Sequence, residues 1–132
     1  MSAMTQTPQA PVLDADSINL LERLSNAVAV SGDEGEVRAI VLEQVKPLAD
    51  EVKVDALGSV LATRKAKVDG APRVMLAAHM DEIGFMLVDD DEGGLFRFAT
   101  VGGIDVRQLV GKPVWVGKQH APGIIGARPI HL

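Results

Sequence analysis

The sequence predicts an α/β fold in which helices pack on a mixed sheet and a small, barrel-like β module follows. Three observations point to this fold. Two early segments have helical periodicity, residues 73–78 form a continuous apolar run of strand length, and short β-like segments punctuated by glycine and proline fill the remainder. Apolar residues make up 47% of the 132 positions, so the chain can bury a hydrophobic core.

A first helix is expected from residue 16. Ser17 or Asp16 is placed to cap it, because either side chain can accept a hydrogen bond from an unpaired backbone N–H of the first turn. The helix should end before Gly32. Its apolar stripe consists of Ile18, Leu21, Leu24 and Val28.

A second helix is expected soon after Ser31. The run Ser31-Gly32-Asp33-Glu34 has the spacing of a capping box, in which the hydroxyl and the carboxylate each satisfy a backbone N–H at the helix start. Pro47 marks the end of this helix or a kink, since proline cannot continue the hydrogen-bond ladder. The apolar face consists of Val37, Ile40, Val41, Val45 and Leu48.

The expected strands follow the helices. Residues 51–55 alternate in polarity and predict a hairpin with residues 59–64, turning at Leu57-Gly58. Residues 73–78 predict a central strand covered on both faces. Further β segments are expected at residues 84–88, 95–101, 112–116 and 124–127, with turns at residues 89–94, 102–103 and 122–123.

Composition narrows the classes of partner and compartment. The net charge is −5 without a cluster of Lys or Arg, so we expect no nucleic-acid partner and no membrane partner, since both bind basic patches. No apolar run approaches the roughly 20 residues that span a bilayer. Residues 1–15 do not have the pattern of a secretory signal and are expected to be a disordered tail. The absence of cysteine suits a cytoplasmic location and leaves His, Asp and Glu as metal ligands.

Chemistry is expected where the central strand ends. His79 follows this strand and Asp81 lies two residues further, so their side chains point the same way in an extended chain. Asp81 could accept a hydrogen bond from one imidazole nitrogen while the other binds a metal, at the edge of the sheet where ligands gather. A hydrogen-bonded structural histidine is the alternative, and Glu82 is a candidate general base.

Other patterns in the sequence do not predict a catalytic or binding site. Gly102-Gly103 is not in a phosphate-loop spacing, and residues 89–92 do not have the spaced ligands of a calcium loop. The serines are not in a nucleophile-elbow context. Asp105 and Arg107 are candidates for a salt bridge.

A longer pattern around His79 resembles a known family. Residues 77–86, Ala-Ala-His-Met-Asp-Glu-Ile-Gly-Phe-Met, are similar to the first metal-site segment of the tetrahedral, deblocking or glutamyl aminopeptidases, which are dinuclear metal enzymes. Further landmarks of that family follow in the same order at residues 30–34, 52–58, 101–107 and 122–132, so the resemblance covers nearly all of residues 17–132.

The resemblance implies a function and a division of the chain. His79 would ligate one of two divalent metal ions, zinc or cobalt, and Asp81 would be the catalytic carboxylate that orients it. The reaction implied is removal of the amino-terminal residue from a peptide. Residues 16–83 would be the first part of the catalytic domain, and residues 84–132 the start of an inserted β domain used for dimerisation and homo-oligomer assembly.

The other ligands and the general base of that family come from segments with no match here, so the rest of the catalytic domain is expected beyond Leu132. Because one histidine cannot hold two metals, this chain alone is expected to be inactive. A non-catalytic binding or assembly module, or a truncated relic of the enzyme, is the alternative function.

Overall fold

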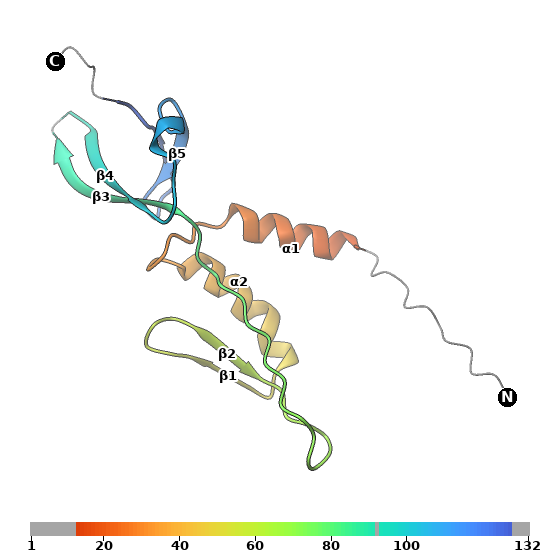
Figure 1. Cartoon of the computed structure of the whole chain (residues 1–132). Coiled ribbons are helices and arrows are strands. Elements are labelled where there is room, and N and C mark those ends of the chain that lie inside the picture. The colour runs from red at the N-terminus through yellow and green to blue at the C-terminus, as the bar shows by residue number, and fades with distance from the viewer. Residues whose placement is uncertain (1–12, 92, 128–132) are drawn as a thin grey trace. The chain divides into compact units, whose positions relative to one another are not determined.

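The protein is described by a computed structural model for residues 13–91 and 93–127 (Figure 1). Its contacts divide the chain into a first unit, Met1–Asp81, and a second unit, Glu82–Leu132. The described strands pair as three separate two-stranded antiparallel sheets. The predicted α/β class is therefore confirmed as two helices with short antiparallel sheets, and a mixed sheet is not formed within the described residues.

Helix α1 (Ala15–Asn26) begins earlier than predicted. Asp14 caps it by accepting a hydrogen bond from the Ser17 N–H at 2.8 Å, so both predicted caps lie inside the helix. A carboxylate at this position also interacts favourably with the positive end of the helix dipole. Ile18 and Leu21, half of the predicted core stripe, are 57% and 65% exposed.

Helix α2 (Gly35–Val45) runs into a short 3₁₀ turn, η1 (Lys46–Leu48), at the predicted proline. Val37 is buried, and most of the predicted apolar face is half-buried, which confirms the orientation of this helix. The predicted capping box is wrong, because the helix is preceded by Glu34 without a side-chain cap and the hydroxyl of Ser31 donates elsewhere.

Strands β1 (Glu51–Val54) and β2 (Val60–Thr63) form the predicted hairpin. Asp55 holds the turn, because its Oδ1 accepts the N–H groups of Leu57 and Ser59 at 2.9 and 2.8 Å. Gly58 has φ +90°, a left-handed conformation that glycine adopts without steric cost.

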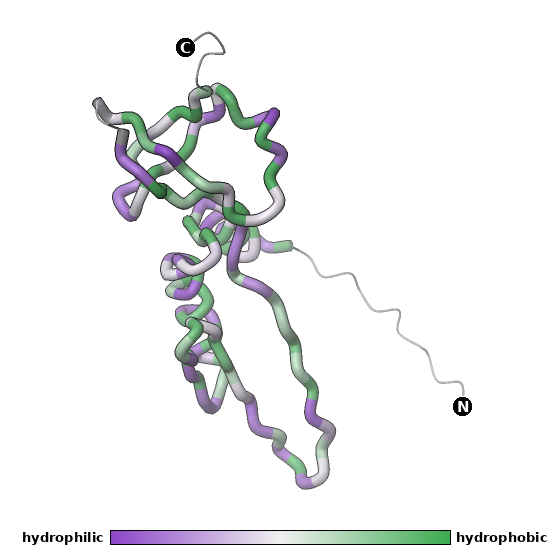
Figure 2. The backbone as a smooth tube through the Cα atoms, turned by 60° about the vertical axis from the view of Figure 1, so that its left-hand side comes forward, coloured by the Kyte–Doolittle hydropathy of each residue, from purple (hydrophilic) through white to green (hydrophobic). Residues whose placement is uncertain are grey.

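The prediction of a central strand at residues 73–78 is wrong for the described chain. The segment is drawn as an unpaired trace in Figure 1, and its hydropathy colouring in Figure 2 is mainly apolar. Val74, Met75 and Leu76 are 81%, 87% and 94% exposed. A strand exists only where another strand accepts and donates its hydrogen bonds, and no neighbouring strand of the described residues does so.

The second unit begins with strands β3 (Gly84–Asp91) and β4 (Leu95–Val101). Their register shifts between Leu87 and Asp89, and the acidic residues predicted to form a turn instead extend β3. Phe85 and Phe98 pack edge to face with ring centroids 4.9 Å apart, which favours pairing at this point of the ladder. The predicted second strand of this hairpin is confirmed.

The rest of the second unit contains a 3₁₀ turn, η2 (Val106–Gln108), and the strands β5 (Pro113–Val116) and β6 (Ala121–Ile124). The predicted turn at Pro122-Gly123 is wrong, because these residues pair with Trp115 and Val114. The chain turns at Gly117, where φ is +65° and the carbonyl accepts the His120 N–H at 3.0 Å.

The described core is small. Its buried apolar residues are Ala29, Val37, Leu109 and Ile125. Across residues 13–91 and 93–127 no helix has the length and apolarity needed to cross a membrane. Most of the predicted tail lies outside the described residues, and its last two residues, Asp14 and Ala15, cap and begin α1.

Candidate functional site

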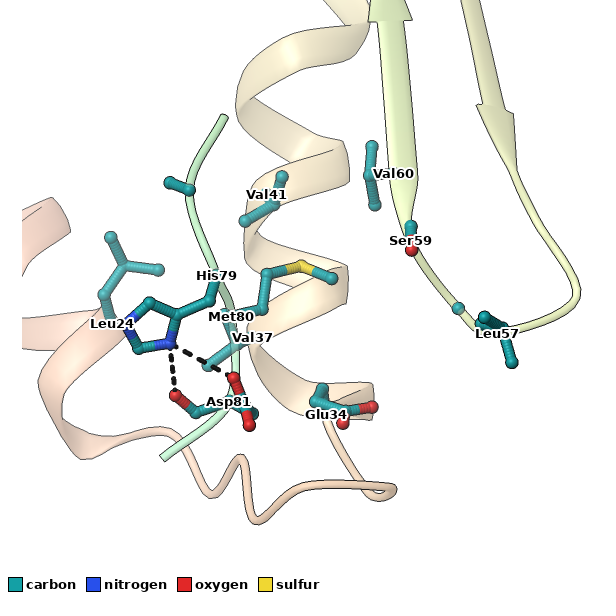
Figure 3. A pocket seen from close by; sticks show the side chains of 12 residues that line it. Leu24, Glu34, Val37, Val41, Leu57, Ser59, Val60, His79, Met80 and Asp81 are labelled. Atoms are coloured by element: carbon teal, nitrogen blue, oxygen red, sulfur yellow. Dashed lines mark hydrogen bonds and ion pairs between the residues drawn. The ribbon is translucent and has the colours of Figure 1, made fainter. Parts of the chain in front are cut away.

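A pocket of about 520 Å³ in the first unit contains both residues that the sequence singled out (Figure 3). Leu24 of α1 and Val37 and Val41 of α2 give it an apolar wall. His79 and Asp81 lie at its rim on the extended segment that follows residue 78. The remaining lining residues are Glu34, Leu57, Gly58, Ser59, Val60, Ala78 and Met80.

His79 and Asp81 form the hydrogen bond that their spacing predicts. The Nδ1 atom of His79 lies 3.1 Å from Asp81 Oδ1 and 2.9 Å from the Asp81 backbone oxygen, as the dashed lines in Figure 3 mark. An ionised carboxylate and a carbonyl oxygen can only accept hydrogen bonds, so Nδ1 must carry the proton. In the neutral ring Nε2 then has its lone pair free, which is the form in which histidine binds a metal.

A serine distant in sequence completes the surroundings of Asp81. The hydroxyl of Ser31 donates to Asp81 Oδ2 at 2.5 Å across 50 positions of the chain. This hydrogen bond is the main cause that lowers the pKa of Asp81 below its ordinary value, and the hydrogen bond from His79 lowers it further. The sequence alone does not indicate this role of Ser31, because its position three residues before Glu34 favours a local capping function and no local signal points to so distant a partner.

Glu34, which lines the pocket, forms an ion pair with Arg38 of the same helix region. Glu34 accepts the Gly32 N–H with one oxygen at 2.5 Å and pairs with the Arg38 guanidinium through the other at 3.1 Å. Arg38 Nε also donates to the carbonyl of Gly58 at 2.6 Å. The hydrogen bond from Gly32 is the main cause that lowers the pKa of Glu34, so this carboxylate stays ionised and holds the turn before α2.

Among the described residues, His79 could serve as a single metal ligand, but a complete set of ligands is not found there. His79 is well prepared, since its ring is 85% exposed and its Nδ1 is already engaged. Within the described residues no three side chains of the His, Cys, Asp and Glu types converge as a metal site. A dinuclear centre needs more protein ligands than His79, and a set of such ligands is not found among the described residues.

None of the other described candidate residues is among those that line the pocket. Glu82 belongs to the second unit, and His131 lies outside the described residues. His120 lies in the turn between β5 and β6, with its ring centroid 6.4 Å from that of Trp115. Arg107 forms the predicted salt bridge with Asp105, using two nitrogens at 2.9 and 2.7 Å from the two carboxylate oxygens.

Curated relatives of the chain are aminopeptidases. The lysyl aminopeptidase of Pyrococcus furiosus is 37% identical over 116 residues, which cover 86% of this chain and 33% of that protein. The chain spans about a third of the length of the curated relatives it matches.

Solved structures give the same relationship in three dimensions. The TET aminopeptidase of a marine-sediment Thaumarchaeota archaeon is 40% identical with a TM-score of 0.74, over 89% of this chain and 33% of that one. The TET1 peptidase of Pyrococcus horikoshii, which can assemble into a tetrahedron or a large octahedral shell, is 36% identical with a TM-score of 0.69, over 87% and 34%. The pattern of the M42 glutamyl aminopeptidases matches residues 58–132, which is more than half of the sequence, and the chain therefore belongs to the M42 glutamyl aminopeptidase family.

Proposed function

We propose that the chain is the amino-terminal part of a metal-dependent aminopeptidase that removes amino-terminal residues from peptides. The observation that carries this proposal is the His79–Asp81 pair, in which Nδ1 is held by carboxylate and carbonyl oxygens and Nε2 is left for a ligand. Membership of the family supplies the reaction class.

His79 is proposed as a ligand of one of two divalent ions, zinc or cobalt. Asp81 orients its imidazole and, by accepting a hydrogen bond from the Nδ1–H group, makes Nε2 more basic. When bound, such ions act as Lewis acids and activate a water molecule. The further ligands and the general base are proposed to lie outside this chain, so the 132-residue polypeptide alone should be inactive.

We propose a division of the chain along the same lines. Residues 16–83 form the first part of the catalytic domain, in which helices flank a mixed sheet completed by segments outside this chain. Residues 84–132 begin an inserted, barrel-like β domain for dimerisation and homo-oligomer assembly. The division of contacts after Asp81 and the two hairpins of the second unit support this proposal. The assemblies of the Pyrococcus horikoshii peptidase support an oligomer.

A cytoplasmic location is part of the proposal, because a cysteine-free chain suits a reducing compartment. Peptides are the proposed substrates. The net charge of −5 without a basic cluster argues against nucleic acid and anionic membranes as partners.

An assembly module without catalytic activity is the second candidate function. The observation that favours it is the exposed apolar surface of the second unit, where Leu95, Phe96 and Trp115 are 68%, 51% and 66% exposed. Such surface is typical of chains that associate.

The experiment that separates the two functions starts from the gene. Its reading frame is followed past the codon for Leu132, and the whole product is assayed on aminoacyl p-nitroanilides with and without a chelator. Hydrolysis that the chelator abolishes, together with an inactive 132-residue chain, is expected for the aminopeptidase. A stop codon directly after Leu132, or a longer product that hydrolyses nothing, would favour the assembly module.

A further inference from the structure

A feature unexplained by the proposed roles of His79 and Asp81 is the hydrogen bond that reaches Asp81 from the turn before α2. In this turn the carbonyl of Val30 accepts the Asp33 N–H at 2.7 Å, and Gly32 has φ +93°. A positive φ at the third residue is typical of a type II turn, which requires glycine there. The turn holds Ser31 at its second position, and from there the hydroxyl reaches Asp81 Oδ2 at 2.5 Å.

The two oxygens of the Asp81 carboxylate therefore have different partners. Oδ2 accepts from Ser31, and Oδ1 accepts from His79 Nδ1 at 3.1 Å. The separation of 2.5 Å is that of a charge-assisted O–H···O⁻ hydrogen bond, which is stronger than a neutral one. Because the carboxylate is held on one side, it cannot rotate freely about its Cβ–Cγ bond, and the oxygen that faces His79 stays in place.

From this geometry we infer that Ser31 is a positioning residue for His79 and acts through Asp81. The chain Ser31–Asp81–His79 keeps the proton on Nδ1 and leaves Nε2 available for a ligand. The inference rests on the proposed function only for what Nε2 binds, since the hydrogen bonds themselves belong to this chain. A simple cap of α2 would use the same hydroxyl, but the described structure has no side-chain cap at that helix.

The test measures the tautomer of His79 in the 132-residue chain. Imidazole ¹⁵N chemical shifts separate Nδ1–H from Nε2–H rings, and spectra are taken at about pH 8.5, some two units above the ordinary pKa of histidine. The His79 signals are assigned by their loss in His79→Gln. His120 serves as an internal reference, since it belongs to the second unit.

Ser31→Thr and Ser31→Val form the matched pair, because they share a branched shape and only threonine keeps the hydroxyl. We expect Ser31→Thr to retain the tautomer ratio of the parent chain. In Ser31→Val the ratio of Nδ1–H to Nε2–H should fall about two- to tenfold, the range that corresponds to one ordinary hydrogen bond. Amide spectra of both variants show whether the turn remains folded, and Ser31→Ala repeats the test with a smaller side chain.

An unchanged His79 tautomer in both folded variants that have lost the hydroxyl, Ser31→Val and Ser31→Ala, would overturn the inference. A change of equal size in Ser31→Thr would also overturn it, because the hydroxyl would then be irrelevant. Failure of the proposed function gives a different result: the tautomer would respond to Ser31, while the product of the whole gene would hold no metal.

Discussion

Gly58 lies beside the pocket, and a methyl group added there should destabilise the fold strongly. Its φ of +90° is unfavourable for any residue with a Cβ atom, and a Cβ built there would lie 2.9 Å from Cζ of Arg38. Gly58→Ala should therefore cost about 1–2 kcal/mol for the left-handed backbone. It should cost about 1 kcal/mol more because Arg38 must give up its hydrogen bond to the Gly58 carbonyl.

The expected total is about 2–3 kcal/mol, which lowers Tm by roughly 10–20 °C in a unit of this size. Thermal unfolding followed by circular dichroism gives the value. Gly70→Ala is the matched control, since Gly70 has φ +72° but nothing within 4 Å of the added Cβ. Equal losses in the two variants would refute the argument from Arg38. The argument would also be refuted if Gly58→Ala lowered Tm by the same amount in the parent chain and in a chain that already carries Arg38→Ala.

Three further results are expected from the described contacts. Hydrogen bonds from Ser59 lower the pKa of Asp55 below its ordinary value of 3.8, so the ionised carboxylate stabilises the fold fully above pH 3.8 and loses this effect as the pH falls through the lowered pKa. The urea midpoint of unfolding should fall over this acidic range. The fall should be smaller in Asp55→Asn, which has no carboxylate to protonate. Arg23 and Glu43 form an ion pair at 2.5 Å, but their side chains are 40% and 57% exposed. Arg23→Ala should therefore lower Tm only slightly at low salt and leave it unchanged at about 1 M salt. A large fall in Tm at both salt concentrations would contradict this. Leu76 is 94% exposed, so Leu76→Lys should leave the free energy of unfolding in urea nearly unchanged. It should also reduce self-association, measured by analytical ultracentrifugation. A clear fall in the free energy of unfolding would mean that this segment is packed.

Local patterns in the sequence predicted the elements whose interactions are local. The hairpin of β1 and β2, the apolar face of α2 and strand β4 depend on alternation, helical spacing and nearby turn residues, and the structure has all of them. The sequence predicts the turn between β5 and β6 too late in the chain, because Pro122-Gly123 has the composition of a turn. On an edge strand, however, a proline without an N–H can still pair, and the chain turns at Gly117 instead.

Features that depend on distant partners could not be predicted in the same way. Residues 73–78 have the composition of a buried strand, but pairing requires a neighbour that the described chain does not provide. The hydrogen bond between His79 and Asp81 followed from a spacing of two. The partner of Ser31 lies 50 positions away, and a serine three residues before a glutamate indicates a capping box until the fold is known.

The metal content of the whole gene product tests the central claim most directly. After dialysis, elemental analysis should find two divalent ions per chain in the parent protein and fewer in His79→Ala, while the matched variant His120→Ala should keep both. The 132-residue chain alone should retain no stoichiometric metal, because its described residues offer no cluster of three ligands. A His79→Ala protein that keeps two ions would contradict the assignment of His79 as a metal ligand.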